Sequence, residues 1–136
     1  MSIVYAQEQS LPVADYVAVL SETTMRGKRP LANAARIGEM IAGANFIVTA
    51  RDDGVILGLA RCTTDHAWVA YCAELAVRES AQGRGVGRGI LEFCMRTLGP
   101  RIGIGLFSEP NALAFYEHLG LTRLDNGFFS NRVDRD

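Results

Sequence analysis

The sequence has no excess of charge of either sign and no long apolar run. Its 136 residues include 14 Lys and Arg against 15 Asp and Glu, which gives a formal net charge of −1 at pH 7. A general nucleic-acid-binding domain usually carries a strong basic excess, so any anion site must be local. No apolar stretch is long enough to cross a bilayer, and the first residues, MSIVYAQEQS, lack the regions of a signal peptide. We therefore expect no nucleic-acid and no membrane partner.

Cysteine is scarce, and its spacing fits neither a disulfide framework nor a metal site. The chain has three cysteines, Cys62, Cys72 and Cys94, an odd number without a CxxC or Cys/His pattern. Buried free thiols in a reducing compartment explain this usage better than disulfides do. The sequence therefore predicts a cytoplasmic protein with no metal centre.

What the sequence does contain is the pattern of an α/β domain. Hydrophobic residues make up 49% of the chain and no repeat or linker divides it, so we expect one domain over residues 1–136. The apolar spacing predicts one helix from Pro12, one that ends near Gly43, and two more at about 88–98 and 110–119. Strands are expected at 3–7, 46–50, 55–61, 68–77, 101–107, 121–124 and 127–131, with a hairpin turn at Asp53-Gly54.

The densest local feature is the run GRGVGRG at residues 83–89. It lies between an expected strand and an amphipathic helix, so it is a tight turn rather than a linker or an RNA-binding segment. A dinucleotide GxGxxG motif would need glycine where the chain has Arg88 or Ile90, and no GxxxxGK[ST] sequence is present. An anion site at a helix N-terminus remains, where backbone N–H groups, Arg84 and Arg88 can bind phosphate; a purely structural turn is the alternative.

Two stretches resemble the signatures of the GNAT superfamily of acyl-CoA-dependent N-acetyltransferases. Gln82-x-x-Gly85-x-Gly87 resembles its Q/R-x-x-G-x-G/A pyrophosphate loop, and AFYEHLGL at 114–121 resembles its second signature, a helix that carries tyrosine. The order of elements is similar from about residue 3 onward. The resemblance implies an α/β fold with a mixed, mainly antiparallel central sheet, helices on both faces, and a splay between the fourth and fifth strands.

The resemblance also implies a site for acetyl-CoA between the strands 68–77 and 101–107. The residues expected to bind it are Leu75, Ala76, Val77, Gln82, Gly83, Arg84, Gly85, Val86, Gly87 and Arg88. Many relatives carry an Asn seven residues before the tyrosine, where this chain has Glu109; whether Glu109 or Asn111 contacts CoA stays open. Gly103 and Gly105 leave one face of the fifth strand bare, for a ligand or for a crossing helix.

Amine acetylation needs a neutral nucleophile, a stabilised oxyanion and a proton for the departing thiolate. The resemblance implies that Tyr116 supplies the proton. Glu74 is the candidate base, because simple alternation places it on an apolar strand face where burial would raise its pKa. A strand bulge would move Glu74 to the other face, and an ordered water is the alternative base.

The function expected from these residues is transfer of an acetyl group from acetyl-CoA to a primary amine by direct attack in a ternary complex, with a small molecule favoured over a peptide or protein as the acceptor. An acyl-CoA-binding sensor or interaction module with little catalysis is the rival. The family makes a homodimer an expectation. The acceptor site is expected to involve the loop residues Met25, Arg26, Lys28 and Arg29, whose basic character indicates an acidic group on the acceptor; a solvated loop is the alternative. Trp68 and Phe128 are expected either to form an apolar wall of that site or to pack in the core.

Overall fold

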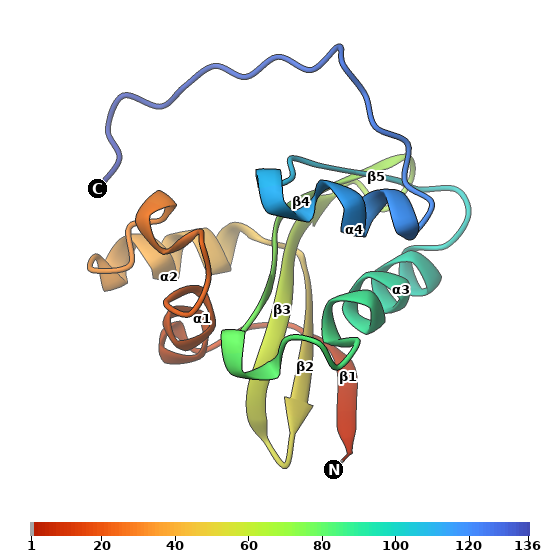
Figure 1. The fold of residues 1–136 in the computed structure, drawn as a ribbon. Coiled ribbons are helices and arrows are strands. Elements are labelled where there is room, and N and C mark those ends of the chain that lie inside the picture. The colour runs from red at the N-terminus through yellow and green to blue at the C-terminus, as the bar shows by residue number, and fades with distance from the viewer. Residues whose placement is uncertain (1) are drawn as a thin grey trace.

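The computed structural model describes residues 2–136 and is built on a five-stranded sheet in the order β1-β2-β3-β4-β5 (Figure 1). The strands are β1 (Ile3–Glu8), β2 (Phe46–Asp52), β3 (Val55–Thr64), β4 (Val69–Val77) and β5 (Gly103–Leu106). The first four pair antiparallel and β5 pairs parallel to β4. The helices are α1 (Val13–Leu20), α2 (Ala34–Gly43), α3 (Val86–Leu98) and α4 (Leu113–His118), with 3-10 turns η1 (Arg26–Lys28), η2 (Glu79–Ala81) and η3 (Pro110–Ala112). This is the expected mixed, mainly antiparallel sheet.

The hairpin between β2 and β3 follows from two residues. Asp53 and Gly54 have φ of 51° and 82°, so both lie in the left-handed region that a type I′ turn requires. An Asp-Gly pair tolerates this conformation, and its twist matches that of the flanking strands. The predicted hairpin is confirmed, and both strands extend further than the apolar pattern indicated.

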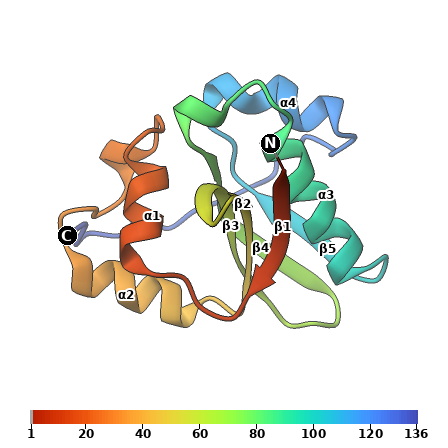
Figure 2. The same ribbon diagram turned by 90° about the horizontal axis from the view of Figure 1, so that it is seen from below.

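Helices cover both faces of the sheet, with α1 and α2 on one side and α3 on the other (Figure 2). One core contains Tyr16 and Ile37 packed with Ile47, and the other contains Val48 packed with Ile90. Neighbouring residues of β2 therefore point to opposite cores, which is why its sequence reads as a continuous apolar run. Each such side chain contributes roughly 1.5–3 kcal/mol by leaving water.

A β-bulge interrupts β4 at Ala73. Arg61 of β3 pairs with Glu74, but the next residue, Cys62, pairs with Cys72, so Ala73 is an extra residue. Cys72 consequently packs on the α3 side, whereas Ala76 packs against α1 and α2. Simple alternation, which would place Glu74 on the same face as Cys72, is therefore wrong here, and the bulge that the sequence left open as the alternative is present.

The pairing of β4 with β5 is short and leaves half of β4 open. It runs from Val69 with Gly103 to Cys72 with Leu106, where β5 ends. Within residues 2–136, no strand pairs with the segment 73–77 of β4 on that side. The segment is therefore an unpaired strand edge, although the carbonyl oxygens of Ala73 and Val77 accept from the side chains of Arg29 and Gln82. This edge agrees with the expected opening between the fourth and fifth strands.

The strands expected at 121–124 and 127–131 are absent, so this expectation is wrong. No strand follows β5 in the described residues, and the segment 121–136 runs from the end of α4 towards α2 (Figure 1). Its apolar residues do not alternate: Leu121 and Leu124 are three apart, and Phe128 and Phe129 are adjacent. A strand built from them would bury no continuous face, and Phe128 is 95% exposed.

Two predicted elements that precede this segment are also shorter than expected. β5 covers Gly103–Leu106 rather than 101–107, and the helix expected at 110–119 is divided into η3 and α4. Gly103 and Gly105 are exposed, and a Cβ at Gly105 would meet nothing within 4 Å. No helix of the described part of the chain, residues 2–136, therefore crosses this bare face. Of the helices within residues 2–136, none combines the length and the apolar character that a bilayer crossing needs.

Candidate active site

A cavity of about 660 Å³ lies beside the bulge, where β4 and β5 separate. Its volume is in the range of small-molecule sites. Its walls come from β4, the end of β5, α4, the loop before α2, and the segment 121–136. The residues that line it include Lys28, Arg29, Arg36, Arg61, Tyr71, Glu74, Leu75, Phe107, Glu109, Tyr116, Phe129 and Arg132.

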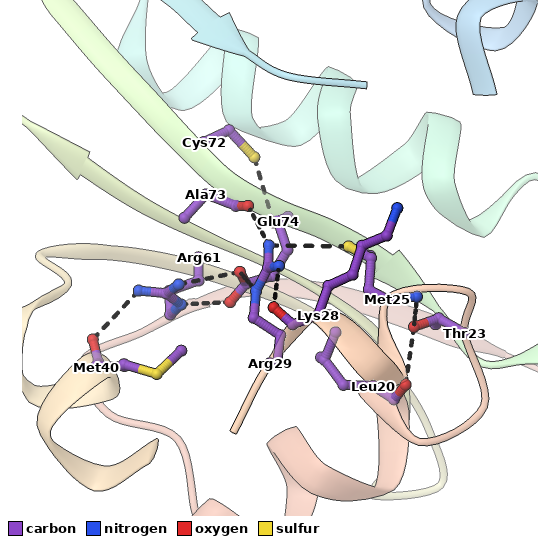
Figure 3. A network of polar contacts seen from close by, with 10 residues as sticks. All are labelled: Leu20, Thr23, Met25, Lys28, Arg29, Met40, Arg61, Cys72, Ala73 and Glu74. Atoms are coloured by element: carbon purple, nitrogen blue, oxygen red, sulfur yellow. Dashed lines mark hydrogen bonds and ion pairs between the residues drawn. The ribbon is translucent and has the colours of Figure 1, made fainter. Parts of the chain in front are cut away.

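The cavity contains a buried carboxylate, Glu74, which is only 3% exposed. Arg61 donates to both of its oxygens, from Nε to Oε1 and from Nη2 to Oε2 at 3.0 Å. Arg29 donates from Nε to Oε2, also at 3.0 Å (Figure 3). Three residues that are far apart in the sequence thus form one ion-pair network.

The network sets the ionisation of Glu74. Burial opposes the charged form, but the hydrogen bonds and charges of Arg61 and Arg29 outweigh it and hold the pKa of the carboxyl below its ordinary value. Burial acts in the expected direction, but the expectation of a raised pKa is wrong in its net direction, because Arg61 and Arg29 more than offset the burial. A carboxylate with a lowered pKa and occupied lone pairs is poorly suited to remove a proton.

Arg29 also fastens the loop before α2 to the bulge. Its Nη2 donates to the carbonyl oxygen of Ala73 at 2.9 Å, and its Nη1 donates to the carbonyl oxygen of Lys28 at 3.0 Å (Figure 3). Nearby, Lys28 Nζ lies 2.9 Å from Glu109 Oε1, an ion pair that joins the same loop to the segment after β5. The loop is therefore a fixed wall of the cavity.

Tyr116 of α4 lines the same cavity. Burial and the neighbouring Cys72 thiol raise the pKa of Tyr116 to about 12. The phenol is therefore protonated at neutral pH and is able to donate a proton. Its position agrees with the role that the sequence motif suggested, although the role itself stays a prediction.

The glycine cluster divides into two pairs. Gly83 and Gly85 have φ of 82° and 75° and open space around them, and Gly85 caps α3. The other two glycines allow close packing: a Cβ at Gly89 would lie 2.3 Å from the Tyr5 ring, and one at Gly87 would lie 3.3 Å from Phe115 Cζ. The first pair shapes the turn that exposes the N-terminus of α3, and the second lets the helix pack closely against Tyr5 and Phe115.

The other residues expected to bind the donor surround this turn. Val86 is buried at 2% exposure, so only its backbone faces the turn, and Gln82 Nε2 donates to the carbonyl oxygen of Val77 at 3.3 Å. Arg88 Nε lies 2.5 Å from Glu92 Oε1, one helical turn on. Arg84 is exposed just before the helix.

Several acceptor-side expectations need correction. Trp68 and Phe128 are 78% and 95% exposed and lie outside the cavity. Its aromatic wall is instead formed by Tyr71, Phe107 and Phe129, with ring centroids 6.1 Å apart for the first two and 5.7 Å for the last two. Sequence reasoning missed these residues because the pairing of β4 with β5 brings the first two together.

Other residues stand where the sequence indicated. Met25, Lys28 and Arg29 line the cavity, whereas Arg26 does not, and Asn111 is exposed. The three cysteines are buried and unpaired, as predicted. Among residues 2–136, no cluster of His, Cys, Asp and Glu has the composition of a metal site.

A sheet that opens between β4 and β5, a glycine turn at the start of α3, and a tyrosine of α4 in the cavity together define an acetyltransferase-type domain. The family model described as "Acetyltransferase (GNAT) domain" matches residues 42–122. This match covers more than half of the chain, and the chain belongs to that family.

Plant acetyltransferases are similar in sequence to about half of the chain. Histone acetyltransferase TAP1 of Glycine max is 40% identical over 67 residues, which cover 48% of this chain and 29% of that protein. The chain thus spans less than a third of the length of the plant relatives that it matches.

Solved structures share the fold at low identity. A probable acetyltransferase from meticillin-resistant Staphylococcus aureus aligns with a TM-score of 0.77 and 18% identity, over 98% of this chain and 99% of that chain. An aminoglycoside N-acetyltransferase in complex with CoA aligns with a TM-score of 0.72 and 17% identity, over 98% and 96% of the two chains.

Proposed function

We propose that residues 1–136 form one acetyltransferase domain that moves an acetyl group from acetyl-CoA to a primary amine of a small molecule. The observation that carries the proposal is the position of Tyr116, which lines the same cavity as segment 73–75 of β4, where β5 leaves that strand. Family membership and the CoA complex of a fold neighbour support an acyl-CoA donor. The size of the cavity favours a small acceptor.

The donor is expected along the free edge of β4 and at the turn before α3. Backbone groups of Leu75, Ala76 and Val77 offer hydrogen bonds to an extended chain, as in the addition of a strand to a sheet edge. The diphosphate fits the turn from Gln82 to Arg88, because Gly83 and Gly85 leave the N–H groups of α3 accessible. Both regions start from the same end of β4.

In the proposed reaction the neutral amine attacks the thioester carbonyl carbon directly. Backbone N–H groups of β4 near Leu75 polarise the carbonyl oxygen, and the carbon–sulfur bond breaks. Tyr116 gives its hydroxyl proton to the departing sulfur, and the proton lost by the amine nitrogen passes through water and restores the phenol. The products are the acetylated amine and the free thiol of CoA.

Glu74 takes a positioning role in this proposal, with water as the proton acceptor. Its carboxylate holds Arg29, and Arg29 holds the carbonyl oxygen of Ala73 at the bulge. Through this chain of bonds Glu74 keeps the free edge of β4 in place beside the cavity.

One observation favours the rival function of an acyl-CoA-binding module: the buried carboxylate of the cavity is already neutralised by arginines. Titration with acetyl-CoA, followed by an amine panel with free CoA as the readout, separates the two functions. A sensor binds acetyl-CoA but releases no CoA with any amine. A cytoplasmic location and a homodimer stay predictions.

The replacement Tyr116→Phe tests the enzyme. We expect acetyl-CoA affinity to persist and kcat to fall by about 10²-fold or more, the usual contribution of a general acid. Tyr5→Phe removes a phenol outside the cavity and serves as the control. An unchanged kcat for Tyr116→Phe, under conditions where chemistry limits the rate, excludes the acid role.

A further inference from the structure

The wall of the cavity is far more basic than the chain as a whole. The chain carries a formal net charge of −1, yet six cationic side chains line the cavity against three carboxylates. The cations are Lys28, Arg29, Arg36, Arg61, Arg132 and Arg135, and the carboxylates are Glu74, Glu109 and Asp136. Lys28 and Arg36 have anionic partners, Glu109 and Asp134, so the excess that remains is concentrated around Glu74 and at Arg132 and Arg135.

Part of the excess is buried. The single carboxylate of Glu74 faces two guanidinium groups, and the side chains of Arg61 and Arg29 are only 14% and 22% exposed. One of the two positive charges has no anionic counterpart in the network. Charges in such surroundings act more strongly on a ligand than they do in water.

The outer wall adds further positive charge. Arg132 and Arg135 line the cavity from the segment 121–136, and no carboxylate in residues 2–136 forms an ion pair with either. The guanidinium of Arg132 lies 5.5 Å from the centroid of the Phe129 ring, which holds it at the cavity wall.

We propose that the acceptor is a small primary amine that also carries an anionic group, a carboxylate or a phosphate, bound by this arginine-rich wall. The inference rests on the proposed function and narrows its substrate class. The same positive charge disfavours the ammonium form of the acceptor, so it helps to present a neutral nucleophile where Glu74 is not available as a base. Polycationic acceptors are disfavoured, unlike the aminoglycoside named for one fold neighbour.

Matched acceptors test the charge preference. With 4-aminobutanoate, its amide and 1,4-diaminobutane, kcat/KM for the neutral-amine form should be highest for the carboxylate, by about tenfold over the amide, and lowest for the diamine. Raising the ionic strength should narrow the difference. Comparing 3-aminopropanoate with 2-aminoethyl phosphate distinguishes a carboxylate site from a phosphate site. Equal use of the three matched amines, or preference for the diamine, overturns the proposal.

Charge variants locate the effect. The double replacement Arg132→Gln with Arg135→Gln should lower kcat/KM for 4-aminobutanoate several-fold more than kcat/KM for the amide, because only the carboxylate loses the attraction of the two charges. Arg132→Lys with Arg135→Lys keeps the charge and should keep most of the preference. Arg101→Gln removes an exposed arginine outside the cavity and should change neither substrate. Equal losses for the amide and the carboxylate contradict the assignment.

Binding measurements separate this inference from the proposed function. If no amine is acetylated, the transferase proposal fails, but calorimetric titration of the same three compounds in the presence of acetyl-CoA still reads the charge preference. Tightest binding of the carboxylate then supports the anion-binding wall on its own. Tightest binding of the diamine, or no binding of the carboxylate at millimolar concentration, overturns it.

Discussion

Two regions of this chain are suited to anions, and they are built in opposite ways. At the start of α3, Gly83 and Gly85 expose backbone N–H groups within one short stretch of sequence. In the cavity, Arg29 and Arg61 converge on Glu74 from separate parts of the chain. The first region is a local motif that sequence alone identifies, whereas the second exists only once the loop before α2 has come together with β3 and β4. Four experiments test this contrast.

The largest effect is expected from Glu74→Leu. The change leaves two guanidiniums facing each other without their shared carboxylate, and losing one partner of a buried ion pair costs about 3–5 kcal/mol. Denaturant unfolding measures the loss. The double replacement Glu74→Leu with Arg61→Met should recover part of it, because one buried positive charge is removed as well. A double variant less stable than Glu74→Leu contradicts the ion-pair account.

Replacing Gly89 tests how the glycine cluster contributes to stability through close packing. A Cβ at Gly89 would lie 2.3 Å from the Tyr5 ring, so Gly89→Ala should destabilise the protein by about 1–3 kcal/mol, as overpacking does. Thermal or denaturant unfolding is the measurement. Adding Tyr5→Leu shortens the opposing side chain and should restore stability in part. Full wild-type stability of Gly89→Ala shows that α3 shifts freely on the sheet.

Gly85→Val separates ligand binding from stability in the same motif. Gly85 has φ of 75° and no atom near its missing Cβ, so valine strains the backbone and covers the N–H groups. We expect acetyl-CoA affinity to fall about tenfold or more, which corresponds to about 1.4 kcal/mol. Gly99→Val is the matched control, since Gly99 has φ of 87° at the other end of α3. Equal affinity losses in the two variants remove the basis for a phosphate site.

The smallest effect is a dependence on pH. Because the pKa of Glu74 is lowered from 4.5 in the folded protein, the unfolded chain binds its proton more readily. The stabilisation is complete above the ordinary pKa and is lost as the pH falls through the lowered one. Wild type should therefore lose stability on acidification below about pH 4.5, and Glu74→Gln should lack that contribution. Glu117→Gln, at the surface, should keep the wild-type profile, and an identical acid slope in all three contradicts the assignment.

The sequence predicted those parts of the fold that are determined locally. The Asp53-Gly54 hairpin and the amphipathic helix α3 depend on residues close in the chain, and both are confirmed. The strands expected at 121–124 and 127–131 depend on a partner strand elsewhere in the sheet, which no local pattern specifies. Their apolar residues do not alternate, so neither segment has a continuous face to bury.

The same reason explains what was missed in the candidate site. Tyr116 lies on a helix with a recognisable pattern, and it lines the cavity as the motif suggested. The environment of Glu74 depends on Arg29, 45 residues earlier, and on a bulge that alternation does not reveal. The direction in which burial shifts the pKa of an acidic residue could be predicted, but the two charged partners of Glu74 could not. Those partners decide the net shift of its pKa.

The bulge at Ala73 lets β4 carry one extra residue without losing its register. Arg61 pairs with Glu74 and Cys62 pairs with Cys72, so each pair keeps its face although β4 has one residue more than β3 between them. Deleting Ala73 would therefore leave Cys72 and Glu74 on their present faces, but it would remove the carbonyl oxygen to which Arg29 Nη2 donates. A substitution at Ala73 keeps that backbone oxygen, whereas a single-codon deletion loses it. Deletion at this position is therefore expected to loosen the wall of the cavity more than replacement does.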